Sequence, residues 1–366
     1  MLIHGLEQAT LGEMARPWDS EQAVDESLRA LQQLPSQPMF IYAGIDEAGY
    51  GPMLGPLCVA SSVFLLEDPP EDGHAPDLWS SLQRALSKTL KEARGRITIT
   101  DSKKLKGARS GRSHPLRHLE RGVLACLGAG ESNSSMLENL TEEDLFERLG
   151  VTVPEHPWYQ TAGPLPTACD TGRLRIDASL LRRAMQSTGI QCAALRCEAM
   201  GAADFNRSID ETRNKSGVNM QLVIRQIEAI WARFPDARPR VVVDRQGGRT
   251  AYREDLQVAW PESSIKVMLE SPEMSRYELT MPGRGELIVI FTMESELHHL
   301  PVALASMTAK YVRELMMGRM NSYFQGRRPG IQATAGYVED ARRYLADIEP
   351  VLAEDRIDRA KLVRCC

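Results

Sequence analysis

The stretch that decides the fold is MFIYAGIDEAGYGPMLGPLCVASSVFLL, residues 39–66. It begins with an apolar run rich in β-branched and aromatic side chains, and this run leads into Asp46 and Glu47. A turn rich in glycine and proline, residues 49–56, separates it from a second apolar run, residues 57–66. Two such runs joined by a short glycine turn predict a β-hairpin, with two acidic residues where the first strand ends.

Further apolar runs predict more strands, and apolar residues spaced at the helical period predict helices. The predicted strands are residues 96–100, 192–200, 240–244, 264–269 and 287–291. The predicted helices are residues 78–93, 218–234 and 301–320. Because strands fill the first third and alternate with helices later, the sequence predicts an α/β fold with a mixed sheet flanked by helices.

The domain prediction has four parts. Residues 1–38 form an N-terminal extension, and residues 39–127 form the first part of the α/β domain. Residues 128–190 start with small polar residues and lack a strong strand pattern, so we expect an inserted, mainly helical subdomain. Residues 191–366 supply the second part of the α/β domain and a C-terminal helical region. The 366 residues are thus interpreted as one domain enlarged by insertions.

The composition excludes several classes of protein. With 44 basic and 49 acidic residues, the net charge of −5 excludes a wholly basic nucleic-acid coat, and 43% hydrophobic residues exclude a disordered chain. The sequence contains no stretch of about 18 uninterrupted apolar residues, so it predicts no membrane span. The seven cysteines include no C-x-x-C pair, and residues 1–15 do not resemble an export signal. We therefore expect a cytoplasmic monomer that does not associate with membranes.

The average charge hides a local asymmetry. Between Lys88 and His118 there are ten basic and two acidic residues, a net charge of +8 that leaves −13 for the other 335 residues. A local positive field in an acidic protein suits a phosphate-bearing partner such as nucleic acid. A solvated surface loop is the alternative interpretation of this basic window.

Three aspartates follow predicted strands and point to metal chemistry. Asp46, Asp101 and Asp244 each stand where a predicted strand ends, and functional groups of open α/β sheets gather at such ends. Clustered carboxylates repel one another, and their pKa values rise unless a cation holds them. Oxygen ligands of this kind suit Mg²⁺ or Mn²⁺, and two such ions about 4 Å apart can activate water and stabilise a leaving oxygen. For Asp46-Glu47 taken by itself, an ordinary strand terminus is the alternative.

The residues around these carboxylates resemble the ribonuclease HII family. Residues 44–56 resemble its opening motif G-I-D-E-A-G-R-G-P-x-x-G-P, and residues 101–105 match its motif D-S-K-K-L. Three further resemblances follow in the family's order: Val243-Asp244 with Gly247-Gly248, residues 305–314 against A-S-I-I-A-K-V-x-R-D, and Gly336-Tyr337 against a late G-Y. The resemblance therefore extends from residue 44 to residue 337, as in a divergent member with insertions.

This resemblance implies a ribonuclease H-like fold and an activity. The expected reaction is two-metal hydrolysis of the RNA strand of RNA–DNA hybrids, or of ribonucleotides embedded in DNA, leaving 3′-OH and 5′-phosphate ends. The catalytic and metal-binding positions implied are Asp46, Glu47, Asp244 and Glu296. Glu296 stands ten residues before Ser306, where the family has an aspartate, so Glu294 or Glu270 are alternatives for the fourth ligand. Glu296 also has the alternative interpretation of an acid stabilised by a following helix N-terminus.

The resemblance also implies substrate contacts. The substrate-binding positions are Gly49, Tyr50, Gly51, Asp101, Ser102, Lys103, Lys104, Lys310 and Tyr337. In the family the glycine motif contacts the ribose 2′-OH, and the tyrosine of the late motif packs on the neighbouring sugar. Lysines near the cut neutralise phosphates without reading sequence. Tyr50 replaces the family's arginine, which removes a guanidinium from the substrate side.

Two other functions stay open on the sequence alone. Tyr50 and the inserted segment are compatible with a ribonuclease H-like nuclease that acts on DNA. The glutamate at the fourth position is compatible with a non-catalytic protein that binds RNA–DNA hybrids through a degraded site. Cleavage assays on matched substrates with and without ribonucleotides distinguish these two functions from the endoribonuclease.

Overall fold

The structure is a computed structural model that describes residues 39–68, 74–105, 113–130 and 134–365. The described residues from 39 onward form one compact unit. The predicted extension, residues 1–38, lies outside the described residues, and so do Lys106, Arg109 and Arg112 of the basic window. The four domain boundaries remain predictions.

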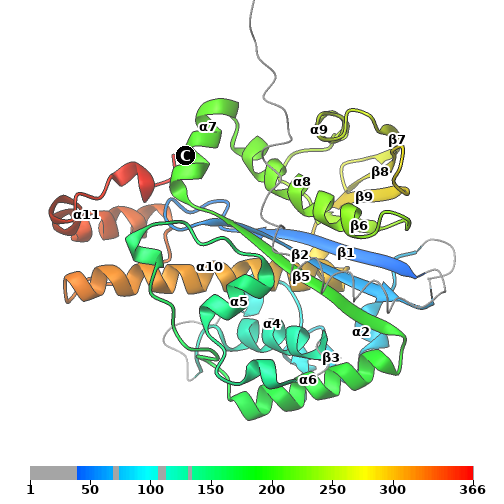
Figure 1. Cartoon of the computed structure of the whole chain (residues 1–366), viewed down its shortest axis with the longest axis horizontal. Coiled ribbons are helices and arrows are strands. Elements are labelled where there is room, and N and C mark those ends of the chain that lie inside the picture. The colour runs from blue at the N-terminus through cyan, green and yellow to red at the C-terminus, as the bar shows by residue number, and fades with distance from the viewer. Residues whose placement is uncertain (1–38, 69–73, 106–112, 131–133, 366) are drawn as a thin grey trace, which may run out of the picture. The chain divides into compact units, whose positions relative to one another are not determined.

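The described residues build a seven-stranded sheet with the order β5-β2-β1-β6-β9-β8-β7 (Figure 1). Its strands are β1 Phe40–Ala48, β2 Leu57–Leu66, β5 Ile190–Met200, β6 Arg240–Asp244, β7 Ser264–Glu270, β8 Met274–Thr280 and β9 Leu287–Thr292. β1, β6 and β9 run parallel, whereas β2, β5, β8 and β7 pair antiparallel with their neighbours. The predicted hairpin and the mixed α/β sheet are therefore confirmed, and the carboxyl ends of the three parallel strands meet at one edge.

Helices cover both faces of this sheet (Figure 1). One face carries α4 Arg117–Gly130, α5 Glu142–Leu149, α6 Thr171–Gln186 and α10 Leu300–Arg327. The other carries α7 Ala202–Thr212, α8 Lys215–Arg233 and α9 Arg253–Ala259. The remaining helices are α2 Leu78–Ser81, α3 Ser102–Leu105 and α11 Val338–Glu354, with short 3₁₀ turns η3 Ser134–Leu137, η4 Pro157–Tyr159, η5 Ser295–Leu297 and η6 Arg359–Lys361. The sheet is thus the middle layer of three, as expected for helices on both faces.

The start of α10 lies directly on β1. A Cβ atom at Gly44 would come within 2.1 Å of the Val302 backbone nitrogen, so only glycine allows this close approach. Next to it, the Ser62 hydroxyl donates a hydrogen bond to the Pro301 carbonyl at 2.7 Å. These contacts fix where α10 begins relative to the strand that carries Asp46.

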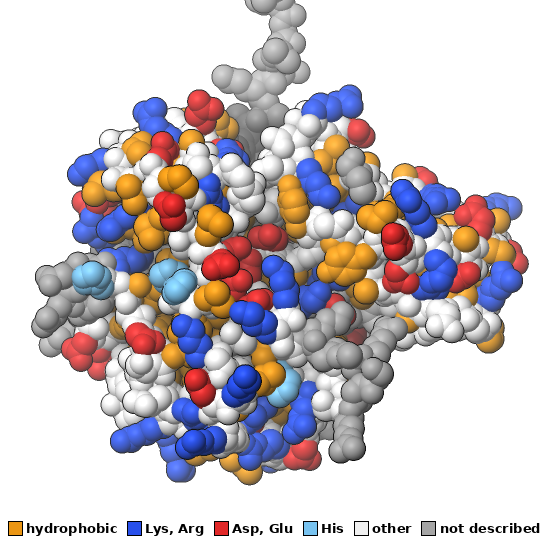
Figure 2. All heavy atoms as spheres, turned by 180° about the vertical axis from the view of Figure 1, so that it is seen from behind, with side chains coloured by type: hydrophobic (Ala, Val, Ile, Leu, Met, Phe, Trp, Pro, Cys, Tyr) orange, Lys and Arg blue, Asp and Glu red, His pale blue; other side chains and the backbone are white. Residues whose placement is uncertain are grey.

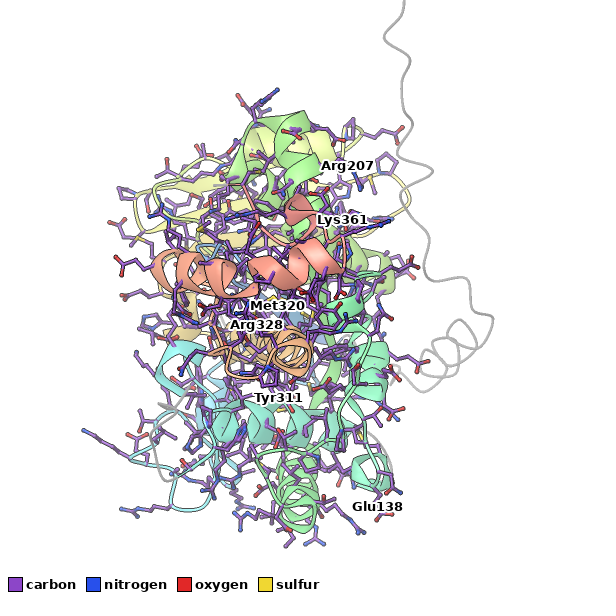
Figure 3. The ribbon with its side chains drawn as sticks, turned by 90° about the vertical axis from the view of Figure 1, so that its left-hand side faces the viewer. Glu138, Arg207, Tyr311, Met320, Arg328 and Lys361 are labelled. Atoms are coloured by element: carbon purple, nitrogen blue, oxygen red, sulfur yellow. The ribbon has the colours of Figure 1, made fainter. Side chains whose placement is uncertain are left out.

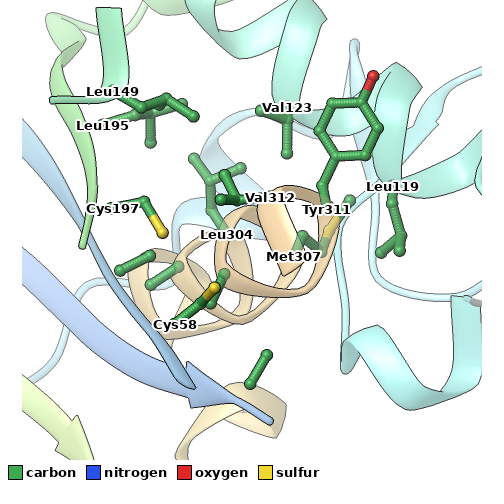
Figure 4. Close-up of a cluster of buried hydrophobic side chains, with 14 of the residues drawn as sticks. Cys58, Leu119, Val123, Leu149, Leu195, Cys197, Leu304, Met307, Tyr311 and Val312 are labelled. Carbon is green, nitrogen blue, oxygen red and sulfur yellow. The ribbon is translucent and has the colours of Figure 1, made fainter. Parts of the chain in front are cut away.

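The core between α10, α4 and the sheet is dense and apolar. Figure 4 shows Leu304, Met307 and Val312 of α10 packed among side chains from α4 and from the strands. These side chains are fully buried. Residues of α5 and α6 belong to the same core, so much of the predicted insertion, residues 128–190, packs on the same face of the sheet as α10 rather than apart from it.

One local prediction was wrong, and another was confirmed only in part. The predicted helix over residues 78–93 is helical only in α2, and the chain then makes turns and a short strand, β3 Leu86–Ser87. β3 pairs in parallel with β4 Ile97–Thr98, so the strand predicted over residues 96–100 lies in a separate two-stranded sheet. The physical reason is a set of tertiary hydrogen bonds, including one from the Arg96 guanidinium to the Gln83 carbonyl at 2.8 Å, which no helix would allow.

Other elements differ in extent. β8 was not predicted, because its buried and partly exposed residues alternate without a continuous apolar run. α10 continues through Arg327 instead of ending at residue 320. In the described part of the chain, no helix has both the length and the apolar character needed to cross a bilayer.

Candidate active site

Asp46 and Glu47 lie inside β1, which continues through Ala48. The prediction that the strand ends before them was therefore wrong. Successive strand residues point to opposite faces. Asp46 accordingly contacts Ser306 of α10, whereas Glu47 lies beside Asn219 of α8. The pair straddles the edge of the sheet.

Asp244 is the last residue of β6 and stands beside this pair. Ile45 of β1 is in register with Val243 of β6, so the residues that follow them, Asp46 and Asp244, are neighbours across the strands. The Asp244 Oδ1 atom accepts hydrogen bonds from the Ser295 hydroxyl at 2.7 Å and the Ser295 backbone N–H at 3.2 Å. Ser295 therefore fixes the orientation of this carboxylate.

Glu296 follows in η5 and reaches the same region. Burial raises its pKa, and the negative charges of Asp244 and Asp101 raise it further. Its Oε2 atom is buried and has no hydrogen-bond partner. Of the two alternatives for the fourth ligand, Glu294 is exposed, and the exposed Glu270 accepts a hydrogen bond from the Tyr277 hydroxyl. The geometry thus favours Glu296.

The carboxylates perturb one another strongly. Burial raises the pKa of Asp46 well above its usual range, and the charges of Glu47 and Asp244 raise it further. Burial and the charge of Asp244 raise the pKa of Glu47 to about 7. Both shifts have the sign expected for desolvated carboxylates without a cation between them.

Lys103 faces all of these acids. Burial lowers its pKa, but the charges of Asp101, Asp46, Glu296 and Asp244 outweigh burial, and the net shift is upward. Its helix, α3, is held by the Lys103 N–H, which donates to Asp101 Oδ1 at 2.9 Å. On the face seen in Figure 2, acidic side chains gather near the middle with basic side chains beside them.

Ser102 and Lys104 of the same motif have different surroundings. The Ser306 hydroxyl donates to the Ser102 hydroxyl at 3.0 Å, so Ser102 ties α3 to α10. Lys104 is 60% exposed and lies 3.9 Å from Asp101, which leaves its ammonium open to solvent. A phosphate approaching the acids would meet Lys104 at the surface and Lys103 deeper.

The glycine turn stands at the end of β1. Gly49 has φ +91°, and a Cβ there would meet the buried Arg313 side chain at 2.6 Å. Gly51 is exposed, and a Cβ there would meet nothing within 4 Å. Lys215 of α8 places its ammonium 5.1 Å from the centre of the Tyr50 ring, a cation–π contact. Gly49 thus serves the internal shape of the turn, and Gly51 is the one open to an incoming molecule.

Two other predicted substrate residues lie farther along α10 and at the start of α11. Lys310 forms an ion pair with Glu314 at 3.1 Å, and both side chains are only 12% exposed. Tyr337 is 54% exposed and follows Gly336, whose carbonyl accepts the Met53 N–H at 2.8 Å. Tyr337 is therefore next to the glycine turn, whereas Lys310 is engaged within its own helix.

The sequence did not predict the roles of three residues that contact the acids, Ser306, Ser295 and Asn219, nor that of Lys215, which contacts Tyr50. Asn219 is fully buried beside Glu47, where its amide partly offsets the rise of that pKa. Ser306 was visible as part of a motif, but nothing in the sequence places Asn219 near Glu47. Its only signal is a polar residue on the apolar face of a predicted helix.

The donor set fits a divalent cation of the Mg²⁺ or Mn²⁺ kind. Among the described residues, no three His, Cys, Asp or Glu side chains are already arranged around one ion position. The acids are nevertheless oxygen donors only, the pKa values of Asp46, Glu47 and Glu296 are raised, and the buried Glu296 Oε2 lacks a partner. A hard cation between them would relieve the repulsion and supply that partner.

Comparison with solved structures finds ribonucleases of one group. RNase HII from Archaeoglobus fulgidus, solved in a complex with PCNA, is 15% identical with a TM-score of 0.38, over 89% of this chain and 94% of that one. Ribonuclease H2 from Pyrococcus horikoshii OT3 is 15% identical with a TM-score of 0.39, over 88% and 92%. Bst-RNase HIII in complex with Mn²⁺ is 15% identical with a TM-score of 0.35, over 92% and 69%.

No model of a protein family matches the chain, and no curated protein sequence does. At these identities and TM-scores, the comparisons assign no role to any residue of this chain. The roles of individual side chains are therefore interpreted from this chain's own geometry.

Proposed function

We propose that this chain is a metal-dependent endonuclease that hydrolyses the RNA strand of RNA–DNA hybrids, or ribonucleotides embedded in DNA. The observation that carries the proposal is a group of acids at one edge of the sheet, where the charge of Asp244 helps to raise the pKa values of Asp46, Glu47 and Glu296 and Lys103 faces them. Acids with raised pKa values around a lysine in this position are typical of a catalytic site rather than of a structural ion pair.

Asp46, Glu47, Asp244 and Glu296 would hold Mg²⁺ or Mn²⁺. Bound there, two ions would activate a water for attack on the phosphodiester and stabilise the leaving oxygen, giving 3′-OH and 5′-phosphate ends. The solved Mn²⁺ complex of Bst-RNase HIII supports this choice of metal. Ser295 keeps the Asp244 carboxylate in one orientation, and the Ser306 contact does the same for Asp46.

The chain's own residues position the substrate. Lys104 at the surface and Lys103 beside the acids neutralise phosphates next to the cut. The exposed Gly51 allows a sugar to approach the backbone, and Tyr50 and Tyr337 offer aromatic faces beside it. The partner is thus a nucleic acid that contains ribose, recognised through its 2′-OH.

One experiment tests the proposal. Three labelled duplexes, a full hybrid, DNA with a single ribonucleotide and plain DNA, are incubated with the wild type and Asp46→Asn in Mg²⁺ and in Mn²⁺. We expect the wild type to cut only the substrates that contain ribose, and the variant to cut none while its circular dichroism spectrum stays unchanged.

Other outcomes identify the alternatives. Equal cutting of plain DNA would support a DNA nuclease. Tight hybrid binding without turnover in either metal would support a non-catalytic hybrid-binding protein.

A further inference from the structure

The carbonyl groups of the glycine turn, residues 49–56, point inward onto buried arginines. The Arg364 Nη2 group donates to the Gly49 carbonyl at 2.5 Å and also to the Pro52 carbonyl. The backbone N–H of Arg364 donates to the Met53 carbonyl at 2.9 Å. Arg364 is 2% exposed, so these charge-assisted hydrogen bonds form away from water.

Residues 359–365 are held in place by α7. The Asn206 amide donates to the carbonyls of Ala360 at 2.9 Å and Val363 at 2.8 Å, and the Cys365 N–H donates back to Asn206 at 2.7 Å. The Arg364 guanidinium lies 5.0 Å from the centre of the Phe205 ring. Figure 3 shows Lys361 close to Arg207 of α7, in agreement with these bonds.

Arg313 holds the turn from the α10 side. Its guanidinium donates to the carbonyls of Leu54 and Ala335, both at 3.1 Å, and the side chain is fully buried. The N–H groups of Met53 and Leu54 donate to the Gly336 carbonyl. The turn is therefore tied along its inner side by residues from three distant parts of the chain.

The bridge made by Arg364 spans the two residues that face outward. Gly49 and Pro52, whose carbonyls it joins, flank Tyr50 and Gly51. A residue that only filled space in the core would not need to join these two carbonyls. The bridge fixes the distance between the ends of the Tyr50-Gly51 segment, and hence the direction of the backbone groups between them.

We propose that Arg364 is a positioning residue that sets the Tyr50-Gly51 backbone for the ribose-bearing strand. The inference rests on the proposed function, since it concerns how the same site binds its substrate. Arg364 lies behind the turn and acts through it, so its loss weakens substrate binding more than the chemical step.

The test uses the full chain with Arg364→Ala and Arg364→Lys, and Arg359→Ala as the matched control. Arg359 stands on the same segment, but its side chain is 59% exposed. Hydrogen exchange without nucleic acid is measured on peptides covering residues 49–56 and, for comparison, β9. KM and kcat are measured on the hybrid, and Kd by fluorescence anisotropy in Ca²⁺.

We expect Arg364→Ala to speed exchange at residues 49–56 but not in β9, and to raise KM and Kd about ten-fold with little change in kcat. Arg364→Lys should recover part of the affinity, because the ammonium keeps the charge and the donors, but the shorter lysine side chain reaches the two carbonyls less well. Arg359→Ala should behave as the wild type.

Two results would overturn the proposal: unchanged Kd and KM despite faster exchange, or a fall in kcat with constant KM. If Arg364→Ala does not fold, Arg364→Lys decides by the same criteria. A wild type that binds hybrid without cutting it contradicts the proposed function alone, because Kd and exchange still report on Arg364.

Discussion

Two groups of buried carboxylates in this protein differ in what surrounds them. Glu120 of α4 is fully buried and accepts five hydrogen bonds, from the N–H and hydroxyl of Thr167, the N–H groups of Ala168 and Cys169, and the Tyr311 hydroxyl. Asp46 is nearly as buried, yet the neighbours that perturb it most are other acids. Burial alone therefore does not mark a functional acid.

The difference teaches how to read buried acids. The donors around Glu120 replace the water that its carboxylate lost on folding, so the group joins α4 to residues 167–169 and to α10. The acids at the edge of the sheet have fewer such donors and repel one another. Such an arrangement costs stability, and a cation that binds there can recover it.

The largest predicted difference between Glu120 and the acids at the edge of the sheet is the effect of a substitution on nuclease activity. Asp46→Asn should lower the rate of metal-dependent hybrid cleavage by about 10³-fold or more, because a metal ligand is lost while the volume of the side chain is kept. Its midpoint of urea unfolding should stay the same or rise, since one repelling charge is removed. A variant that cuts at the wild-type rate would remove Asp46 from the site.

Glu120→Gln should show the opposite pattern. The amide nitrogen would face donors that now bond to a carboxylate oxygen, so we expect a loss of about 3 kcal/mol in the free energy of unfolding. Urea denaturation measures this, with the exposed Glu147→Gln as control. The protein that stays folded should still cleave hybrid, and a selective loss of kcat without loss of stability would contradict the structural role.

A third prediction concerns the fourth ligand. Glu296→Gln should raise the Mn²⁺ concentration needed for half-maximal cleavage by about ten-fold or more, because it removes one oxygen donor. Glu294→Gln and Glu270→Gln are the matched controls and should leave this concentration unchanged. An effect confined to either control would move the fourth ligand to that position.

The smallest effect is the pH dependence of stability without metal. The pKa of Glu47 is raised to about 7 in the folded protein. The stability that protonated Glu47 contributes is therefore fully present at pH values below the pKa of Glu47 in the unfolded chain. This stability is lost as the pH rises through about 7. In EDTA, Glu47→Gln should therefore gain about 1–3 kcal/mol relative to the wild type between pH 5.5 and pH 8.5. Urea unfolding at both values checks this, and equal differences would mean that Glu47 is not perturbed.

The sequence predicted the elements whose pattern is local. The hairpin of β1 and β2, strand β6 and helix α8 follow from apolar runs and helical periodicity, and their observed ends differ little from the predicted ones. The helix prediction for residues 78–93 failed because this segment forms hydrogen bonds with residues farther along the chain, in place of the helix that the local pattern favours. Propensity is a weak guide wherever such tertiary bonds form.

The site was predictable to a similar degree. Strand ends placed Asp46 near Asp244, and a motif led to Glu296, but the opposite directions of Asp46 and Glu47 follow from how far β1 continues. Asn219 and Arg364 reach the site only through packing of α8 and of residues 359–365. No spacing along the chain reveals such contacts, because they join parts of the chain that are far apart in sequence.

Helix α10 has a consequence for which insertions and deletions the protein can accept. Along one continuous helix, Ser306 reaches the acids, Tyr311 binds Glu120, Arg313 holds the glycine turn and Arg319 pairs with Glu142. One residue added before Ser306 would rotate all four contacts by about 100° at once. Length changes among related chains should therefore fall in the surface loops, while the spacing between these four positions stays constant.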